Sequence, residues 1–397
     1  MCGHEGFYGI SKDYFAARNC LFTSEEIARQ PKLWLDLAGI LIDRKDDIEA
    51  FLEKAGGAGS MRIIFTGAGS SGFIGDALAA LIAKDSRVRA ESIHSTDIVT
   101  APESYLFADV PTLLVSFARS GNSPESVGAV EYARAICKDL HEVAIVCDDT
   151  SDLYHYSVKA ERGLILVMPE GSNDKGFAMT SSVSCMLLAG FALFNADKID
   201  DLARDIALLA ETVKASGQGL AKTAREWAER DFDRIVYLGC GFRKALAHEA
   251  ALKMMELTGG IVNGSYESSA GFRHGPKSVI NNNTLTVHMI SNDPFTAMYD
   301  LDLLKEVVSQ QERNMILSLY PENAQGAMGD EAIPIGADGY AIGSDICTGL
   351  QALVFCQTLA MFKSMSLGVN TDNPSPTGTV NRVVKGITVY GYKSRGK

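Results

Sequence analysis

The chain has 397 residues, of which 46% are hydrophobic and 22% are charged, and its formal net charge is −12. This length is enough for two domains of ordinary size, and the composition is that of a well-packed globular protein. The acidic balance argues against nucleic-acid partners, because a phosphate backbone is bound by clustered Lys and Arg. A small anionic ligand is not excluded, since helix N-termini and turn amides also bind phosphate in acidic proteins.

No membrane span, signal peptide or metal site is expected. The longest apolar run, residues 183–194, is well short of the roughly 20 residues that cross a bilayer. The first residues, MCGHEGFYGISKDYF, lack the basic-then-apolar pattern of a signal peptide. The eight cysteines are scattered without a CxxC pair, which indicates reduced thiols and predicts a cytoplasmic protein without zinc.

The amino-terminal half of the chain alternates strands with helices. An irregular arm over residues 1–22 precedes a helical stretch, in which Thr23 and Glu26 have capping-box spacing and Pro31 predicts a break. Strands are predicted at 62–66, 88–93, 112–117, 143–147 and 164–168. Strands that alternate with helices in this way form a parallel sheet covered on both faces.

The carboxyl-terminal half repeats this plan after a charged helical segment at residues 200–230. Its strands are predicted at 235–238, 285–290 and 315–319, and its helices at 242–257, 299–307 and 346–366. The recurring order of elements predicts an α/β protein with two similar units. We divide the chain into an arm with a helix (1–44), a first domain (45–212) and a second domain with a carboxyl-terminal tail (213–397).

The first strand-to-helix turn carries the pattern Gly67-x-Gly69-x-x-Gly72, with Glu91 about twenty residues further on. This spacing is also found in dinucleotide-binding folds, so a nicotinamide-dependent dehydrogenase is one alternative. The motif is weak by itself. Bare amides and hydroxyls at a helix start serve a sugar phosphate equally well, and a pyrophosphate site does not require the hydroxyls of Ser70 and Ser71.

A second Ser-rich turn, Arg119–Ser126, follows the third predicted strand and opens another helix. Two such turns at the carboxyl edge of one parallel sheet meet at one crevice, which suits a monophosphate held by hydroxyls and amides. Capping of the helix by Ser123 and turn formation by Gly121-Asn122 would account for part of this pattern. They leave the number of hydroxyls unexplained.

The helix at 242–257 carries Glu249, Lys253 and Glu256 at spacing i, i+4 and i+7, which places them on one face. A solvated Glu249–Lys253 ion pair and a functional role are both open readings of the first two. Glu256 stands in the last turn beside Met254 and Met255, where the helix dipole and apolar neighbours both disfavour its charge. Such a carboxylate is a candidate general base.

His274 follows this helix in the run Phe272-Arg273-His274-Gly275-Pro276. An imidazole and a carboxylate together are what proton transfer on a small polar substrate needs, although a histidine bonded to its own turn is the alternative. His248 and His288 are expected to be structural, because they fall in helical and strand contexts.

Several of these runs match known motifs. The segments TGAGSSGFIGDAL, SFARSGNSPES, EAALKMMELT and FRHGP resemble the SIS (sugar isomerase) family. The segments DKGFAMTSS, FRHGPKS, YDLDLL and GTVNRVV are similar to those of AgaS-type galactosamine-6-phosphate deaminase/isomerases, which are also described as tagatose-6-phosphate ketose/aldose isomerases. The resemblance covers the chain from about Thr23 to Tyr390.

The resemblance implies two SIS domains, each a five-stranded parallel sheet flanked by helices, in a dimer or dimer of dimers. The chain also resembles the isomerase half of glucosamine-6-phosphate synthase, which implies roles for single residues. Glu256 would move a proton between C1 and C2, His274 would open the sugar ring, often in the neighbouring subunit, and Lys385 would be a catalytic lysine. Phosphate contacts fall to Ser70, Ser71, Arg119 (a Gln in the synthase), Ser120 and Ser123, and sugar contacts to Gly69, Asn173, Lys175 and Lys253.

The expected reaction converts D-galactosamine 6-phosphate to D-tagatose 6-phosphate and ammonia, without a metal or another cofactor. Tagatose-6-phosphate ketose/aldose isomerisation and glucosamine-6-phosphate deamination are alternatives, because the sequence does not reveal the preferred stereochemistry at C4. A non-catalytic module that senses sugar phosphates is a further alternative, and no DNA-binding segment accompanies it here.

Overall fold

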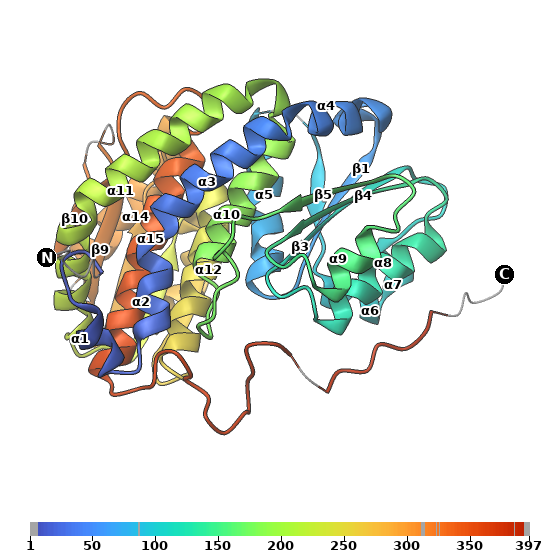
Figure 1. The fold of residues 1–397 in the computed structure, drawn as a ribbon. Coiled ribbons are helices and arrows are strands. Elements are labelled where there is room, and N and C mark those ends of the chain that lie inside the picture. Colours follow the sequence, from blue (N-terminus) through green and yellow to red (C-terminus); the bar gives the residue numbers. More distant parts are fainter. Residues whose placement is uncertain are drawn as a thin grey trace, which may run out of the picture. The chain divides into compact units, whose positions relative to one another are not determined.

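The structure, a computed structural model, describes residues 7–85, 88–310, 314–322, 324, 326–384 and 386–392. The chain forms two compact units, each assembled from three separate stretches. The sheet-1 unit comprises Gly39–Asn173, Cys185–Ile199 and Val380–Lys397, and the sheet-2 unit comprises Met1–Ala38, Asp174–Ser184 and Asp200–Thr379. Each unit is built around one five-stranded parallel sheet (Figure 1).

The strands of the sheet-1 unit follow the order β2-β1-β3-β4-β5. They are β1 (Arg62–Thr66), β2 (Ala90–Ser92), β3 (Thr112–Ala118), β4 (Leu140–Val146) and β5 (Gly163–Val167). Every residue of β3 is buried, as in a strand covered on both faces. Helices α6 (Ser95–Thr100), α8 (Pro124–Ile136) and α9 (Asp152–Ser157) share a core with alternate strand residues, and α5 (Ser70–Asp85) packs against β1, β2 and β3.

The sheet-2 unit has the order β10-β9-β8-β6-β7, which is the order of sheet 1 read from the other end. Its strands are β6 (Arg234–Leu238), β7 (Asn263–Glu267), β8 (Thr284–Met289), β9 (Met315–Pro321) and β10 (Glu331–Ile335). Helix α12 (Phe242–Leu257) packs against β6, β7 and α15 (Ser344–Ser366). The predicted fold, two α/β units that each contain a five-stranded parallel sheet flanked by helices, is therefore confirmed.

The remaining helices connect and cover these sheets. They are α1 (Lys12–Ala16), α2 (Leu21–Ala28), α3 (Gln30–Asp43), α4 (Lys45–Lys54), α7 (Pro102–Tyr105), α10 (Ser181–Leu193), α11 (Ile199–Ala228), α13 (Ser269–Phe272) and α14 (Pro294–Ser309), with short 3-10 turns η1 (Ala58–Ser60), η2 (Ala196–Lys198) and η3 (Pro276–Val279). Helix α15 is long and apolar enough to cross a membrane, but its most apolar window is 94% buried, which is the environment of a core helix.

The sequence patterns miss the two outer strands of sheet 2, β7 and β10. The segment NGSYE of β7 is polar and nowhere fully buried, and β10 contains Pro334, a residue tolerated at sheet edges. Both strands lie at the edges of the sheet, where one side of the backbone needs no partner strand. One sheet falls within each of the predicted segments 45–212 and 213–397, and the boundaries themselves stay a prediction.

The predicted capping box at Thr23 and Glu26 is wrong. Both residues lie inside α2. The N–H and the hydroxyl of Thr23 each donate to Asp372 at a distance of 2.8 Å. The break predicted at Pro31 is confirmed, because α2 ends before it and α3 begins one residue ahead of it. This position costs nothing, since a proline in the first helical turn has no N–H partner to lose.

Glu26 is a buried carboxylate in the sheet-2 unit, with only 1% of its surface exposed. It accepts hydrogen bonds from the backbone N–H groups of Lys175, at 2.5 Å, and Gly176, at 3.1 Å. Burial, followed by the nearby carboxylate of Asp174, raises the pKa of Glu26 to about 8. Glu26 therefore binds a proton on folding over much of the neutral range.

We expect the Glu26→Gln variant to lose a pH-dependent part of the stability. The folded pKa lies above the unfolded value of 4.5, so the contribution is complete below that pH and is lost as the pH rises to about 8. Gln keeps a carbonyl oxygen for the two N–H donors. Urea unfolding of both proteins between about pH 5 and pH 9 measures the effect. The wild-type minus variant difference in unfolding free energy should fall with rising pH, and a constant difference contradicts the assignment.

Candidate functional site

Two loops leave the carboxyl edge of sheet 1 from adjacent strands. One follows β1 and opens α5, and the other follows β3 and opens α8. Strands β1 and β3 are paired in register, with Thr66 opposite Ser116. The strand order reverses between them, because β2 lies on one side of β1 and β3 on the other. This is the switch point at which ligands bind in open α/β sheets.

The β1–α5 loop is built for close approach to a ligand. Gly69 has φ +55°, is exposed, and has open space where a side chain would project. Gly67 packs so closely on the first turn of α5 that a Cβ would lie 2.6 Å from the Ser71 backbone. Ser70 and Ser71 are 4% and 5% exposed at the N-terminus of α5. An anion here would meet hydroxyls and the positive end of a helix dipole.

The β3–α8 loop places Arg119, Ser120 and Ser123 at the neighbouring strand end. Arg119 is 7% exposed, whereas Ser120 and Ser123 are half-buried. Ser123 occupies the N-cap position of α8, but its hydroxyl makes no capping hydrogen bond. Capping therefore does not account for this serine. Both sets of hydroxyls predicted from the sequence lie on the loops where a phosphate site was expected.

Glu91 is held in an ion pair that a dinucleotide site would not use. Its two carboxylate oxygens accept from Nε and Nη2 of Arg62, both at 2.8 Å. The hydrogen bond from Arg62 lowers the pKa of Glu91. In a dinucleotide site this carboxylate would bind ribose hydroxyls. The pairing with Arg62 therefore weakens the nicotinamide alternative.

Helix α12 holds the predicted Glu249–Lys253–Glu256 face, and most of this face is buried. Lys253 is 0% exposed, and its Nζ lies 2.5 Å from Glu256 and 3.4 Å from Glu249, whose side chain is 2% exposed. The solvated-surface reading of Glu249 and Lys253 is therefore wrong. Glu256 is partly buried, as its place in the last turn predicts, with 24% of its side chain exposed, and the structure adds a lysine partner for its carboxylate.

The other predicted residues lie apart in the chain. His274 is exposed in the turn between α13 and η3, and its N–H donates to the Gly271 carbonyl at 2.9 Å. Lys175 has an exposed side chain, while its N–H is bound by Glu26. Asn173 ends the sheet-1 segment and donates to Asp148 at 3.3 Å. Lys385 lies outside the described residues.

His248 and His288 have structural surroundings. The ring of His248 stacks on Tyr266 with 3.9 Å between the ring centroids. His288 is 1% exposed in β8, and burial lowers its pKa to about 3. A neutral, buried imidazole of this kind is not a proton carrier near neutral pH.

The corresponding edge of sheet 2 carries different chemistry. Gly241 has φ +56°, close to the +55° of Gly69 in sheet 1. The two residues after it are Phe242 and Arg243 rather than two serines. The guanidinium of Arg243 is buried and donates to Asn292 and Thr348, both at 2.6 Å. Desolvation lowers the pKa of Arg243 to about 10. No local pattern in the sequence marks this arginine as buried.

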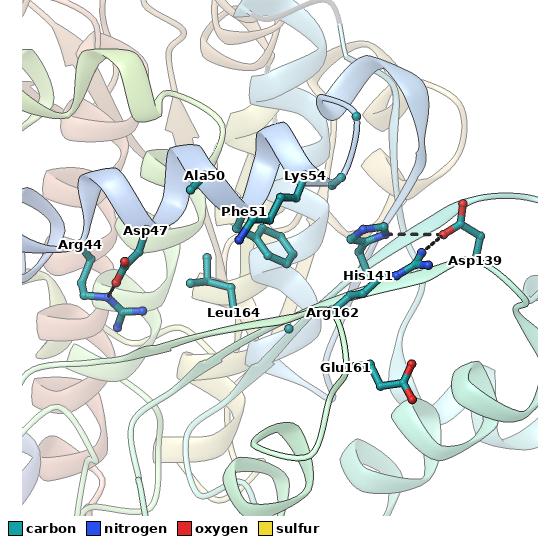
Figure 2. A pocket seen from close by; sticks show the side chains of 13 residues that line it. Arg44, Asp47, Ala50, Phe51, Lys54, Asp139, His141, Glu161, Arg162 and Leu164 are labelled. Atoms are coloured by element: carbon teal, nitrogen blue, oxygen red, sulfur yellow. Dashed lines mark hydrogen bonds and ion pairs between the residues drawn. The ribbon is translucent and has the colours of Figure 1, made fainter.

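A cavity of about 850 Å³ lies at the amino edge of sheet 1, beside α4 and the starts of β4 and β5 (Figure 2). Four of its charged side chains form ion pairs, Arg44 with Asp47 at 2.7 Å and Arg162 with Asp139 at 2.5 Å. None of the residues predicted to bind substrate lines this cavity. The two Ser-rich loops stand at the opposite edge and remain the candidate site.

Known proteins resemble this chain in sequence and in fold. The SIS domain model matches residues 58–196 and 230–323. A Shewanella protein named D-galactosamine-6-phosphate deaminase AgaS is 37% identical over 389 residues, 96% of this chain and 95% of its own. A solved structure from Clostridium novyi is 38% identical with a TM-score of 0.93, covering 98% of this chain and 100% of that one. Escherichia coli tagatose-6-phosphate ketose/aldose isomerase is 33% identical with a TM-score of 0.85, covering 94% and 97%. The chain therefore belongs to the SIS domain family.

Proposed function

We propose that the protein is a deaminating aldose–ketose isomerase that converts D-galactosamine 6-phosphate to D-tagatose 6-phosphate and ammonia. The observation that carries this proposal is the pair of Ser-rich loops at the switch point of sheet 1. They suit a phosphate monoester, and a full-length relative bears the name of this deaminase. The names of these relatives support isomerase and deaminase chemistry on a sugar phosphate, and hydrolysis of an imine is the step that would release ammonia.

The proposed chemistry needs one proton relay. Ser70, Ser71, Ser120 and Ser123, with Arg119, hold the 6-phosphate, and Gly69, Asn173 and Lys175 contact the sugar. Lys253 is fully buried, so it acts through Glu256 and does not contact the sugar. His274 assists ring opening, which exposes the C1 aldehyde. Glu256 then takes the proton from C2 and returns it to C1 through an enolamine, while the aldehyde oxygen gains a proton and the amine nitrogen loses one.

The relay leaves an imine at C2. Water adds to this imine, ammonia leaves, and the carbonyl of the ketose remains. Lys253 supports the step by fixing one oxygen of Glu256 at 2.5 Å, so that the carboxylate is held in one orientation. Lys385 remains a predicted catalytic residue. These reaction steps together require neither an oxidant nor a metal, because they only move protons, add water and release ammonia.

In the deciding experiment, purified protein is incubated with D-galactosamine 6-phosphate without added metal or nucleotide. Ammonia and ketose phosphate are measured together. D-glucosamine 6-phosphate is the parallel sample. Equal amounts of ammonia and ketose from the galacto sugar alone support the proposal. Ammonia from the gluco sugar alone keeps the mechanism but changes the substrate. Binding without turnover would support the sensing alternative.

Plain isomerisation is a second candidate function. It is favoured by the likeness to the Escherichia coli structure named tagatose-6-phosphate ketose/aldose isomerase. The same phosphate site and the same proton relay would serve it, since only the imine hydrolysis is absent. Incubation with D-tagatose 6-phosphate, followed by assay for the aldose phosphate, distinguishes this function from deamination.

We also propose a cytoplasmic homodimer or dimer of dimers in which His274 completes the site of the neighbouring subunit. His274 is exposed on its own chain, as a shared residue must be. Light scattering gives the assembly state. Co-expressed Glu256→Gln and His274→Ala chains give the sharper test, because a mixed dimer then keeps one intact site. We expect activity to return in the mixed dimer, and sites built from a single chain would leave the mixture inactive.

A further inference from the structure

The carboxyl-terminal tail belongs to the sheet-1 unit, although it follows the whole of sheet 2 in sequence. Its described residues, 380–384 and 386–392, include contacts with the loops at the carboxyl edge of sheet 1 and with α8. Lys385, the predicted catalytic lysine, falls between these two groups of contacts. The contacts nearest the candidate site involve Arg382.

Arg382 stands between two residues predicted to bind the substrate. Its backbone carbonyl accepts a hydrogen bond from Nη2 of Arg119 at 2.7 Å, and its own Nη2 donates to Oδ1 of Asn173 at 2.9 Å. Asn173 in turn donates to Asp148 at 3.3 Å. These bonds connect the loops after β3, β4 and β5, which leave the same edge of the sheet.

The bonds determine how the two binding residues are presented. An Asn side chain has two N–H donors and two acceptor lone pairs. With Arg382 at its oxygen and Asp148 at its nitrogen, the amide of Asn173 can adopt only one of its two flips. The Asn173 amide can still donate one hydrogen bond and accept one more. Arg119, 7% exposed, is restrained through the tail carbonyl in the same way.

We propose that Arg382 is a positioning residue that sets Asn173 and Arg119 for the binding of a sugar phosphate. The proposal rests on the proposed function for the identity of the ligand. It needs no contact between Arg382 and the substrate. Loss of one charge-assisted hydrogen bond should then weaken binding by about tenfold, with little change in the chemical step.

The tail has a second attachment that allows this role to be separated from simple docking. The hydroxyl of Tyr132 on α8 donates to the carbonyl of Tyr390. Val389 packs so closely on Gly128 that a Cβ there would lie 2.8 Å from its Cγ1. The ring of Tyr392 lies 5.7 Å from that of Tyr132. These contacts do not involve Arg382, so they should keep the tail in place when its side chain is changed.

The experiment compares Arg382→Met, Arg382→Lys and Tyr132→Phe with the wild type in the full-length protein. Arg382→Met removes the charge and the donor, Arg382→Lys keeps one donor, and Tyr132→Phe loosens the tail at its other attachment. Steady-state kinetics give KM and kcat, and calorimetric titration with inorganic phosphate measures binding without turnover. Hydrogen exchange over residues 380–392 reports tail docking.

We expect Arg382→Met to raise KM about tenfold with kcat within about threefold, Arg382→Lys to recover part of this loss, and exchange in the tail to stay as in the wild type. The phosphate Kd should change little, because the backbone carbonyl of residue 382 still accepts from Arg119. An unchanged KM in Arg382→Met overturns the proposal. So does an equal effect of Tyr132→Phe, or a tail released by Arg382→Met, because docking alone would then explain the loss. A wild type that binds D-galactosamine 6-phosphate without turnover overturns the proposed function, and the Kd values for that sugar phosphate then decide the role of Arg382.

Discussion

Glu256→Gln is expected to bind the sugar phosphate about as well as the wild type and to lose turnover by at least ~10²-fold. Gln has nearly the shape of Glu and keeps an oxygen for Lys253, whose Nζ donates to Glu256 at a distance of 2.5 Å. It cannot take a proton from C2. The variant therefore removes the base while the phosphate site, on another part of the chain, keeps its residues.

Two measurements make this test specific. The first is the dissociation constant of the substrate or of inorganic phosphate, which should be unchanged in the variant. The second is exchange of the C2 hydrogen with deuterium from the solvent, which reports the proton relay even if ammonia release is slow. Exchange and turnover close to those of the wild type would remove Glu256 from the role of base. Loss of binding would assign it to the substrate site instead.

Lys253→Met is expected to have the largest effect on stability, a loss of about 3–5 kcal/mol in the free energy of unfolding. Lys253 is fully buried in α12 and lies 3.4 Å from Glu249, whose side chain is 2% exposed. Methionine fills most of the volume but cannot pair with a carboxylate. Glu249 would then be a buried charge without its cation, which is far more costly than a broken surface pair.

The matched control is the double variant Glu249→Gln/Lys253→Met, in which no buried charge is left without its partner. It should recover much of the lost stability. Urea unfolding of the wild type, Glu249→Gln, Lys253→Met and the double variant gives the coupling free energy directly. Additive losses would mean that the two side chains do not interact. A cost below about 1 kcal/mol for Lys253→Met would mean that the pair behaves as a surface pair.

The local features of this chain could be read from its sequence because they depend on neighbouring residues. The turn Gly67-x-Gly69 needs a glycine at φ +55° and a helix that starts at the next residue, and both requirements are visible within a few letters. The same holds for α12, whose predicted bounds are those in the structure. The two buried parallel sheets follow from long apolar strands, whereas the polar or proline-containing edge strands β7 and β10 do not.

Burial of charge could not be read in this way. The spacing i, i+4, i+7 predicts that Glu249, Lys253 and Glu256 share a face, and it says nothing of what covers that face. Helix α15, about a hundred residues later, packs against α12, and Lys253 of α12 is fully buried. The pairing of Glu91 with Arg62 likewise depends on β2 lying beside β1, which no spacing between the two residues reveals.

The sequence alone determined the α/β class, the repeated plan and the two loops suited to a phosphate, since periodicity and turn chemistry act over a few residues. Only the tertiary structure decided that Lys253 is buried between two carboxylates and that the tail meets the first sheet. Arg382 and Arg119 are bonded across more than two hundred residues of chain. Contacts at such separation are set by how the sheets and helices pack, and packing leaves no local pattern in the order of the residues.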